Sequence, residues 1–385
     1  MEPVIVERAD VIAFRAERHQ LGREPASVPA TDVDLLDLGV QDTGTFGSAW
    51  ALEVRGARSA GPDDLLLTWT IRGAPHAYRR RDVGAVTVAT APFSEADAAA
   101  RVFDASKQLH EAGVDVLDAL TIVARLLRDI VRRPLPKGDV SSRLSERLDP
   151  PYLRYCRSCD ATHSYEQTFR LAALQAGLEL EPGTSPPVLR RIPGRRAAPY
   201  RHLATEADPG FDVIRGYLRF YGPAPLKAVA TYLDAPVAEV KANIPDDVVD
   251  VRVRDLDGKV DGKRATRLAL AEDVEVLAGA AERSGDRVVR LVGSHDPYLQ
   301  LRDRDLLVAE RSKQKDLWRT LGRPGALLID GEVVGTWRPR TSGGTLSVHI
   351  DPWAPVKGPI RAAVQAEAER LAAHRELPLR AVDGI

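Results

Sequence analysis

The sequence predicts an α+β protein made of tandem winged-helix domains and a small C-terminal β-rich, barrel-like unit. Three observations support this fold class. The chain has 385 residues, which exceeds one ordinary domain, so several units with cores of their own are expected. Apolar residues at helical spacing dominate the first part, and groups of helices are followed by an extended return. After about residue 286 the pattern changes to short strands separated by turns.

The first unit is expected over residues 1–92. Residues 8–20 have the apolar spacing of a helix, a second helix is expected after Thr31, and residues 48–54 are predicted to form a third. Residues 65–78 form the extended return. Helices followed by a returning strand pair are the element order of a winged helix, whose two strands make the wing.

The second unit, residues 93–200, is predicted to combine a helical linker with a second winged helix. Its strongest signal lies at residues 114–133, where apolar side chains recur every three or four positions and basic residues suit the end of the helix dipole. A shorter helix at 139–148 and a strand at 188–192 complete this unit.

The third unit, residues 201–283, has the clearest helix-turn-helix and hairpin order. The expected elements are helices at 211–221, 226–233 and 236–243 and strands at 248–253 and 267–270. The C-terminal unit, residues 284–385, contains the strongest hairpin signal, Asp330-Gly331. Its expected elements are strands at 288–292, 306–308, 326–329, 333–337 and 345–350 and a terminal helix at 360–374.

Composition favours a soluble, cytoplasmic protein. The sequence has no run of about twenty apolar residues, and its start lacks the basic and apolar regions of a signal peptide. The net charge of −1 argues against a wholly cationic nucleic-acid binder. Residues 182–205, however, contain no acid and carry five arginines, Arg190, Arg191, Arg195, Arg196 and Arg201. That segregation predicts one basic face, and the alternative is a solvated, arginine-rich connector.

Two segments near the start carry chemistry that a hydrophobic core does not require. Gln41, Asp42 and Thr43 place an amide, a carboxylate and a hydroxyl at the end of an apolar run. Arg72 and His76 flank a Gly-Ala-Pro bend at a point where a strand turns back.

With these segments, and with residues 293–298 and 330–337, the chain resembles the AlkZ/YcaQ-type winged-helix DNA glycosylases over essentially its whole length. Known members of that family release alkylated or crosslinked bases from DNA. The resemblance implies that the partner is double-stranded DNA, possibly damaged. It also implies a monomer that needs no cofactor and that associates with the nucleoid when it is bound to DNA.

The resemblance implies a chemistry for the first of these segments. In the family, catalysis is assigned to a Gln, an apolar residue and then a Gln or Asp. An N7-alkylated purine is cationic and leaves readily, so the protein chiefly holds a water at the anomeric carbon and stabilises charge on the sugar. Gln41 matches the first position, and its amide can orient a water as donor and acceptor. Asp42 and Thr43 depart from the pattern. We expect Asp42 to assist as a base or a charge stabiliser, and the alternative is that Asp42 and Thr43 cap a helix beginning near Gly44.

Arg72 and His76 match a second family segment, Arg-Gly-Thr-x-His, here with Ala74 at the third place. Arg72 is expected to meet a phosphate, and His76 to hydrogen-bond substrate or backbone. The alternative is that Arg72 pairs with Asp64 or Asp82 and that His76 is a satisfied polar group at a strand end. The arginine triplet that follows suits a wing tip on the DNA backbone, or it is merely solvated. The expected DNA-binding residues are Arg72, His76, Arg79, Arg80, Arg81, Arg190, Arg191, Arg195 and Arg196.

Cys156, Cys159 and His163 have half the spacing of a structural zinc site. A closed site needs a fourth ligand, such as Glu166 or a remote His. We expect no metal, with the two thiols packing as small apolar groups.

These observations predict a monofunctional DNA glycosylase in which Gln41 positions water and Asp42 assists. The alternative is a non-catalytic DNA-binding regulator of the same fold in which the altered triplet has lost the chemistry. A small-molecule enzyme unrelated to DNA is a third hypothesis, favoured only by the near-zero net charge.

Overall fold

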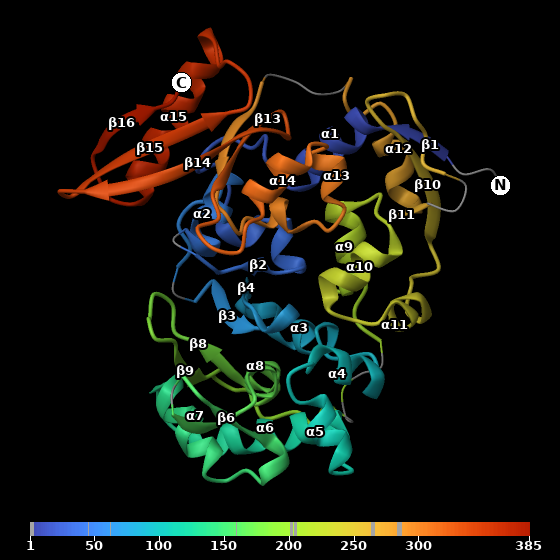
Figure 1. Ribbon diagram of the computed structural model, residues 1–385, viewed down its shortest axis with the longest axis vertical. Coiled ribbons are helices and arrows are strands. Elements are labelled where there is room, and N and C mark those ends of the chain that lie inside the picture. Colours follow the sequence, from blue (N-terminus) through green and yellow to red (C-terminus); the bar gives the residue numbers. More distant parts are fainter. Residues whose placement is uncertain are drawn as a thin grey trace.

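The computed structural model describes residues 4–44, 46–61, 63–158, 160–200, 203, 206–262, 266–282 and 287–385. The fold is α+β, as predicted. In Figure 1 the teal and green segments form the lower part of the molecule, and the N-terminal, yellow, orange and red segments form the upper part. Within the described ranges, no helix combines the length and the hydrophobicity that are needed to cross a membrane.

A six-stranded sheet connects the two parts. Its order is β2-β4-β3-β8-β9-β5, and every neighbouring pair is antiparallel. The strands are β2 (Val40–Gln41), β3 (Leu65–Trp69), β4 (Pro75–Arg79), β5 (Leu135–Pro136), β8 (Leu178–Leu180) and β9 (Val188–Arg191). β3 and β4 form the expected extended return. Because β8 pairs with β3, the sheet joins segments that the sequence analysis assigned to the first and second units.

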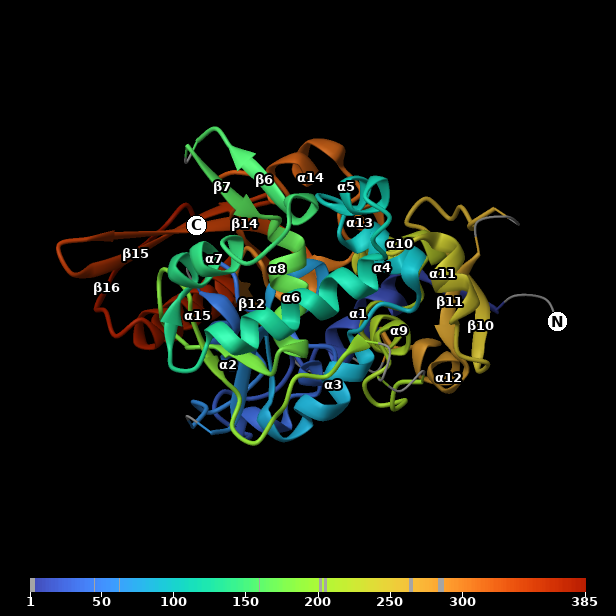
Figure 2. The ribbon, with the colours of Figure 1, turned by 90° about the horizontal axis from the view of Figure 1, so that it is seen from below.

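Helices pack around the lower part of this sheet. They are α3 (Val83–Ala89), α4 (Glu95–Arg101), α5 (Ser106–Glu111), α6 (Val116–Ile130), α7 (Lys137–Ser145) and α8 (Glu166–Gln175). α6 is the helix predicted at 114–133 and lies beside α8, as Figure 2 shows from below. Its apolar face, including Leu120, Val123 and Leu127, is fully buried.

A small hairpin of β6 (Leu153–Cys156) and β7 (Ala161–Ser164) carries two of the residues considered for zinc. Cys159 lies outside the described residues. Cys156 is partly exposed, with its sulfur 3.1 Å from Ser158 Oγ, so it is not the buried thiol that was expected. The residues that the structure describes contain no group of three or more His, Cys, Asp or Glu side chains arranged to hold a metal.

The upper part begins with α1 (Arg8–Arg18) and α2 (Gly47–Val54), which match two of the predicted helices. Between them, where a helix was expected after Thr31, the chain forms only short 3-10 turns at Ala30–Asp32 and Asp34–Asp37. The expectation is wrong there because the apolar side chains of this segment are buried in the core without forming one helical stripe. Tertiary packing therefore overrides the helical spacing.

Residues 213–270 have the predicted order of three helices followed by a hairpin. The elements are α9 (Val213–Tyr221), α10 (Leu226–Leu233), α11 (Val237–Ala242), β10 (Val248–Arg254) and β11 (Arg267–Leu270), followed by α12 (Val274–Leu277). The N-terminal strand β1 (Val4–Glu7) runs parallel to β10, with Val4 opposite Val251, and extends this hairpin to three strands. The third predicted unit is thus tied to the start of the chain.

The C-terminal part is a five-stranded sheet in the order β12-β13-β14-β15-β16. Its strands are β12 (Val289–Val292), β13 (Gly325–Ile329), β14 (Glu332–Ser342), β15 (Thr345–Pro352) and β16 (Leu379–Asp383), and its helix is α15 (Gly358–His374). Among the described strands, β12 and β16 remain edges, so the expected barrel-like unit is an open sheet. α15 packs against both β12 and β16. Asp330 and Gly331 form the predicted turn, both with positive φ.

Residues 304–307 form the helical turn α13 (Arg304–Leu307), where a strand was expected at 306–308, and α14 (Arg311–Leu317) follows. The expectation fails because a short apolar run cannot be told from a buried helical turn by its spacing.

A buried ion pair fixes the upper part around the candidate site. Arg55, which follows α2, donates to Asp296 from both terminal nitrogens, at 2.7 and 2.9 Å. Both side chains are 0% exposed. Asp296 follows β12, so this pair holds residues 293–296 against the N-terminal end of the fold.

Candidate active site

Gln41 and Thr43 present their side chains together at the end of β2. The pairing of β2 with β4 places Gln41 opposite His76. Residues two apart in an extended segment project to the same side, and here Gln41 Nε2 donates to Thr43 Oγ1 at 3.0 Å. Both side chains are partly exposed. The amide and the hydroxyl therefore form one polar surface that solvent can reach.

Arg72 fixes the orientation of the Gln41 amide. It lies in the turn between β3 and β4 with a left-handed backbone, φ 59°. One terminal nitrogen donates to Gln41 Oε1 at 3.2 Å and the other to the Tyr232 carbonyl at 2.6 Å. The guanidinium also lies over the Tyr232 ring, 4.5 Å from its centroid. The structure thus brings together the two sequence segments that carried the resemblance, and Arg72 pairs with neither Asp64 nor Asp82.

Asp42 points away from this polar surface. Its Oδ1 accepts hydrogen bonds from Ser48 N at 2.7 Å and from Ser48 Oγ at 2.9 Å, in the first turn of α2. The carboxylate therefore caps α2, which is the alternative that the sequence left open for Asp42. Thr43 takes no part in this cap and bonds Gln41 instead. Asp42 and Ser48 also border a cavity of about 440 Å³ between α2 and the β3–β4 hairpin.

His76 is buried and neutral. Its side chain is 1% exposed, and Nδ1 lies 2.9 Å from the Ala74 carbonyl and 3.1 Å from Thr70 Oγ1. Burial, followed by the charge of Arg72, lowers the pKa of His76 to about 3. An enclosed imidazole of this kind supports the turn, and its burial does not fit the DNA contact that was expected of it.

The Arg79–Arg81 triplet divides into three different environments. Arg79 is buried, donates to the Val33 carbonyl at 2.9 Å and pairs with Asp37, so it is a core residue and not the surface contact that was expected. Arg80 pairs with Glu179 at 2.9 Å. Arg81 leaves 69% of its side chain exposed. Of the three, only Arg81 has the exposure that a wing-tip contact requires.

The second predicted arginine group is also mostly engaged within the fold. Arg190 pairs with Glu179 at 3.0 Å, and Arg191 donates to the Arg128 and Val131 carbonyls at the end of α6. Arg195 donates to Thr87 Oγ1, whereas Arg196 is exposed. Arg201 lies outside the described residues.

This group does not adjoin the Gln41 surface. β9 stands four strands from β2 in the sheet order, which corresponds to about 19 Å at the usual spacing of strands. The basic stretch of the sequence and the Gln41 surface are therefore separate features.

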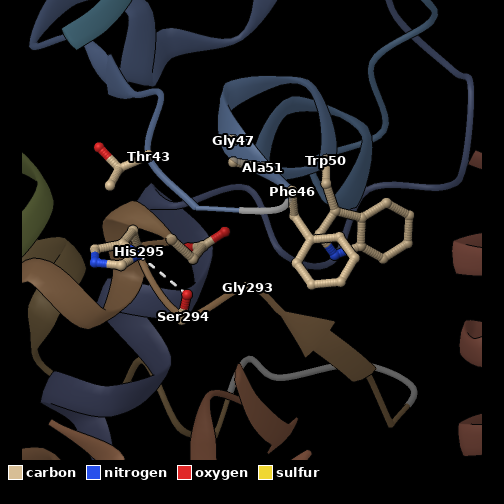
Figure 3. Close-up of a pocket in the computed structure, with 9 residues that line it drawn as sticks. Thr43, Phe46, Gly47, Trp50, Ala51, Gly293, Ser294 and His295 are labelled. Atoms are coloured by element: carbon tan, nitrogen blue, oxygen red, sulfur yellow. Dashed lines mark hydrogen bonds between the residues drawn. The ribbon is translucent and has the colours of Figure 1, made fainter. Parts of the chain in front are cut away.

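Ser294 and His295 lie beside the Gln41-Asp42-Thr43 triplet, and the sequence analysis did not include them among the candidate site residues. Figure 3 shows Thr43 and His295 at a narrow hollow that Phe46 and Trp50 also line. The hollow has a volume of about 10 Å³, which is room for about one water molecule. Gly44 lies directly against this pair, because a Cβ there would stand 3.2 Å from His295 Nδ1. Residues 293–298 match a segment of the family, but no local sequence pattern indicates that they lie beside Thr43.

Besides Arg72, arginines outside the predicted set place positive charge near His295 and Arg72. Arg304 is the first residue of α13, Arg302 precedes this helix and Arg323 follows α14; each is half-buried. The sequence gives no charge run here, since Asp303 and Asp305 alternate with the arginines. Only the tertiary structure distinguishes these arginines from paired surface residues.

Comparison with known proteins identifies the class of protein to which this fold and site belong. A family model described as DNA glycosylase AlkZ-like matches residues 51–374. The chain belongs to this AlkZ-like DNA glycosylase family. The matched region includes Arg72, His76 and Ser294–His295 and begins after the Gln41-Asp42-Thr43 triplet.

A solved structure supports the same fold. The DNA glycosylase AlkZ of Streptomyces sahachiroi is similar with a TM-score of 0.68 and 20% sequence identity, covering 98% of this chain and 100% of that chain. No curated protein sequence matches the chain. At this identity the structural likeness concerns the fold, so the role of each residue rests on the geometry of the site.

Proposed function

We propose that the protein is a monofunctional DNA glycosylase that hydrolyses the N-glycosidic bond of alkylated or crosslinked purines in double-stranded DNA. Membership of the AlkZ-like family supports the class of reaction. The observation that carries the proposal for this chain is the Gln41–Thr43 surface, whose amide is oriented by Arg72.

The site suits a reaction in which the leaving group needs little help. Water oxygen bonds to C1′ of the sugar while the bond from C1′ to N9 breaks, and the electron pair of that bond neutralises the cationic purine. The water proton passes to solvent. Gln41 and Thr43 offer donors and acceptors that hold this water in line with the bond that breaks. Because Arg72 and Thr43 fix both ends of the amide, little reorganisation is required when the substrate binds.

Asp42 has a positioning role in this proposal and is not the general base. Its Oδ1 is occupied by Ser48, on the side away from Gln41. A carboxylate base is dispensable for a purine that leaves as a neutral molecule. Asp42 instead fixes the start of α2 and, with it, the backbone that carries Thr43.

A second candidate is a non-catalytic DNA-binding protein of the same fold. The observation that favours it is the absence of a carboxylate or second amide at position 43, where the family pattern has Gln or Asp. In this alternative the Gln41–Thr43 surface contacts DNA without hydrolysing the glycosidic bond.

Release of free base from a duplex that contains N7-methylguanine tests the proposal. We expect release by the wild type and a loss of about 10²-fold or more in Gln41→Ala, which is the order of effect of a lost positioning or polar catalytic group. Gln108→Ala, at an exposed position on α5, is the matched control and should retain full activity. If the wild type releases no base from a panel of alkylated and crosslinked duplexes but still binds them, the second candidate replaces the first.

A further inference from the structure

Four neighbouring arginines link Gln41 to His295. We call Arg72, Arg302, Arg304 and Arg323 the arginine arc. Its first two members are connected through two neighbouring tyrosines, Tyr232 and Tyr217. Arg72 lies over Tyr232, whose ring centroid is 4.9 Å from that of Tyr217, and Tyr217 Oη accepts a hydrogen bond from Arg302 N at 3.3 Å.

The other two members of the arc are held at Trp318, which follows α14. The Arg304 guanidinium lies 4.8 Å from the centroid of the Trp318 ring, and Arg323 Nε donates to the Leu317 carbonyl at 3.3 Å. Trp318 is fixed in turn by a hydrogen bond from its Nε1 to the Leu299 carbonyl at 2.9 Å.

The arc begins and ends beside the triplet. Arg72 touches Gln41 at one end. At the other end the charge of Arg323 adds to burial in lowering the pKa of His295, the residue that lies against Gly44. The arc therefore connects Gln41 with His295, which lines the same narrow hollow as Thr43.

These arginines lack the partners that other arginines of the fold have. Within the described ranges, none of the four forms an ion pair with a carboxylate, whereas the buried Arg15 and Arg55 each meet one. Arg302 Nε is buried without a hydrogen-bond partner among the residues described. The charge of Asp234 interacts with Arg72 and Arg302, although Asp234 forms no ion pair with either arginine.

The arrangement is electrostatically unfavourable until an anion is present. Burial and the charge of Arg72 lower the pKa of Arg302, and burial with the charges of Arg304 and Arg302 lowers the pKa of Arg323 to about 10. A group of partly desolvated cations that form no ion pairs raises the free energy of the folded protein. A bound anion would remove that cost, and planar guanidinium groups match the oxygens of a phosphodiester.

We propose that the arginine arc binds the DNA backbone phosphates that flank the nucleotide facing Gln41 and Thr43. This inference rests on the proposed function, because that function supplies the nucleotide. The proposal assigns binding of the DNA backbone beside the reacting nucleotide to residues 302–323, and not to the arginine stretch at 190–196.

The test is binding of an undamaged duplex, measured by fluorescence anisotropy at several salt concentrations, for Arg302→Gln, Arg304→Gln and Arg323→Gln. Each lost phosphate contact should reduce the slope of log affinity against log salt by about 0.9, which is about eightfold in affinity at 0.1 M salt. Arg361→Gln, an exposed arginine on α15, removes the same charge elsewhere and should change neither quantity appreciably. Replacing the phosphates next to an N7-methylguanine by neutral methylphosphonates should remove the difference between wild type and arc variants.

Thermal unfolding provides a second measurement. If the arc is an unfilled anion site, each variant should melt at a higher temperature than the wild type in low salt. Stabilisation of the wild type by added inorganic phosphate should be reduced in the variants. Variants that melt lower and bind DNA like the wild type would show a structural role and overturn the proposal.

The outcomes separate this inference from the proposed function. Arc variants that bind and release base like the wild type would overturn the phosphate site alone. If added phosphate stabilises the wild type more than the arc variants but all of them bind DNA equally, the arc binds free phosphate, and the proposed DNA phosphate site is also overturned. A wild type that binds no duplex at low salt would overturn both proposals.

Discussion

Replacing Asp42 separates a capping carboxylate from a catalytic one. Its Oδ1 accepts two hydrogen bonds from Ser48, so the side chain acts as an N-terminal cap of α2. Asn retains an acceptor at the same position and caps helices about as well as Asp, whereas Ala has none. Asp42→Asn therefore keeps the cap and removes the charge, and Asp42→Ala removes both.

The expected magnitudes follow from that difference. Asp42→Ala should lower the free energy of unfolding by about 1 to 2 kcal/mol, and Asp42→Asn by less than about 0.5 kcal/mol. Urea unfolding followed by tryptophan fluorescence measures both, because Trp50 lies on α2. Base release from N7-methylguanine DNA should stay within a few-fold of wild type in Asp42→Asn.

A general base contributes about 10²-fold to 10⁴-fold to a rate. If Asp42→Asn loses activity on that scale with unchanged stability, the carboxylate takes part in the chemistry and the positioning role is refuted. Gln108→Ala again serves as the control for handling and assay variation.

Two further predictions concern stability. Arg55→Met leaves the fully buried Asp296 without its partner, so urea unfolding should show that the free energy of unfolding falls by about 3 to 5 kcal/mol. Adding Asp296→Asn to the same chain should restore part of this loss. An unchanged unfolding midpoint in Arg55→Met would contradict the role of this pair. The pKa of His76 is about 3 in the folded protein, below its ordinary value of 6.5, so between these values the unfolded chain binds a proton that the native state excludes. Stability should therefore fall as pH decreases from 6.5 toward 3, by at most about 1.4 kcal/mol per pH unit for this group, and His76→Asn should reduce that pH dependence in urea unfolding compared between pH 7.5 and 4.5. Equal pH dependence in the two proteins would count against a buried, neutral His76.

Helices and strands with a long or sharply bounded local pattern match their predicted ranges best. α10 and β11 have the predicted bounds, and α6 lies within its predicted range. The predictions are wrong at residues 31–38, where side chains are buried without a helical stripe, and at 306–308, where Leu306 and Leu307 lie in a helical turn. In both places packing against distant segments decides the conformation.

Predictions for the site show the same division. The sequence singled out the segments of Gln41 and Arg72, about thirty residues apart, without predicting a contact, and the structure brings the two side chains within hydrogen-bonding distance. The choice between base and cap for Asp42 stayed open in the sequence, because it depends on which way the side chain turns. Arg79 and Arg81 are two positions apart and alike in sequence, yet one is buried and the other is exposed.

The sequence by itself determined the family, the α+β class and most helices and strands, because these depend on motifs and on the spacing of neighbouring residues. The tertiary structure decided which charges are neutralised. Arg79 is buried because the Val33 carbonyl and Asp37 are available to it. Arg302 forms no ion pair with a carboxylate among the described residues, since the adjacent Asp303 pairs with Arg15 and Arg267 instead. Pairing depends on residues that are distant along the chain and adjacent in space, so the cationic surroundings of Gln41 emerge only when the chain is folded.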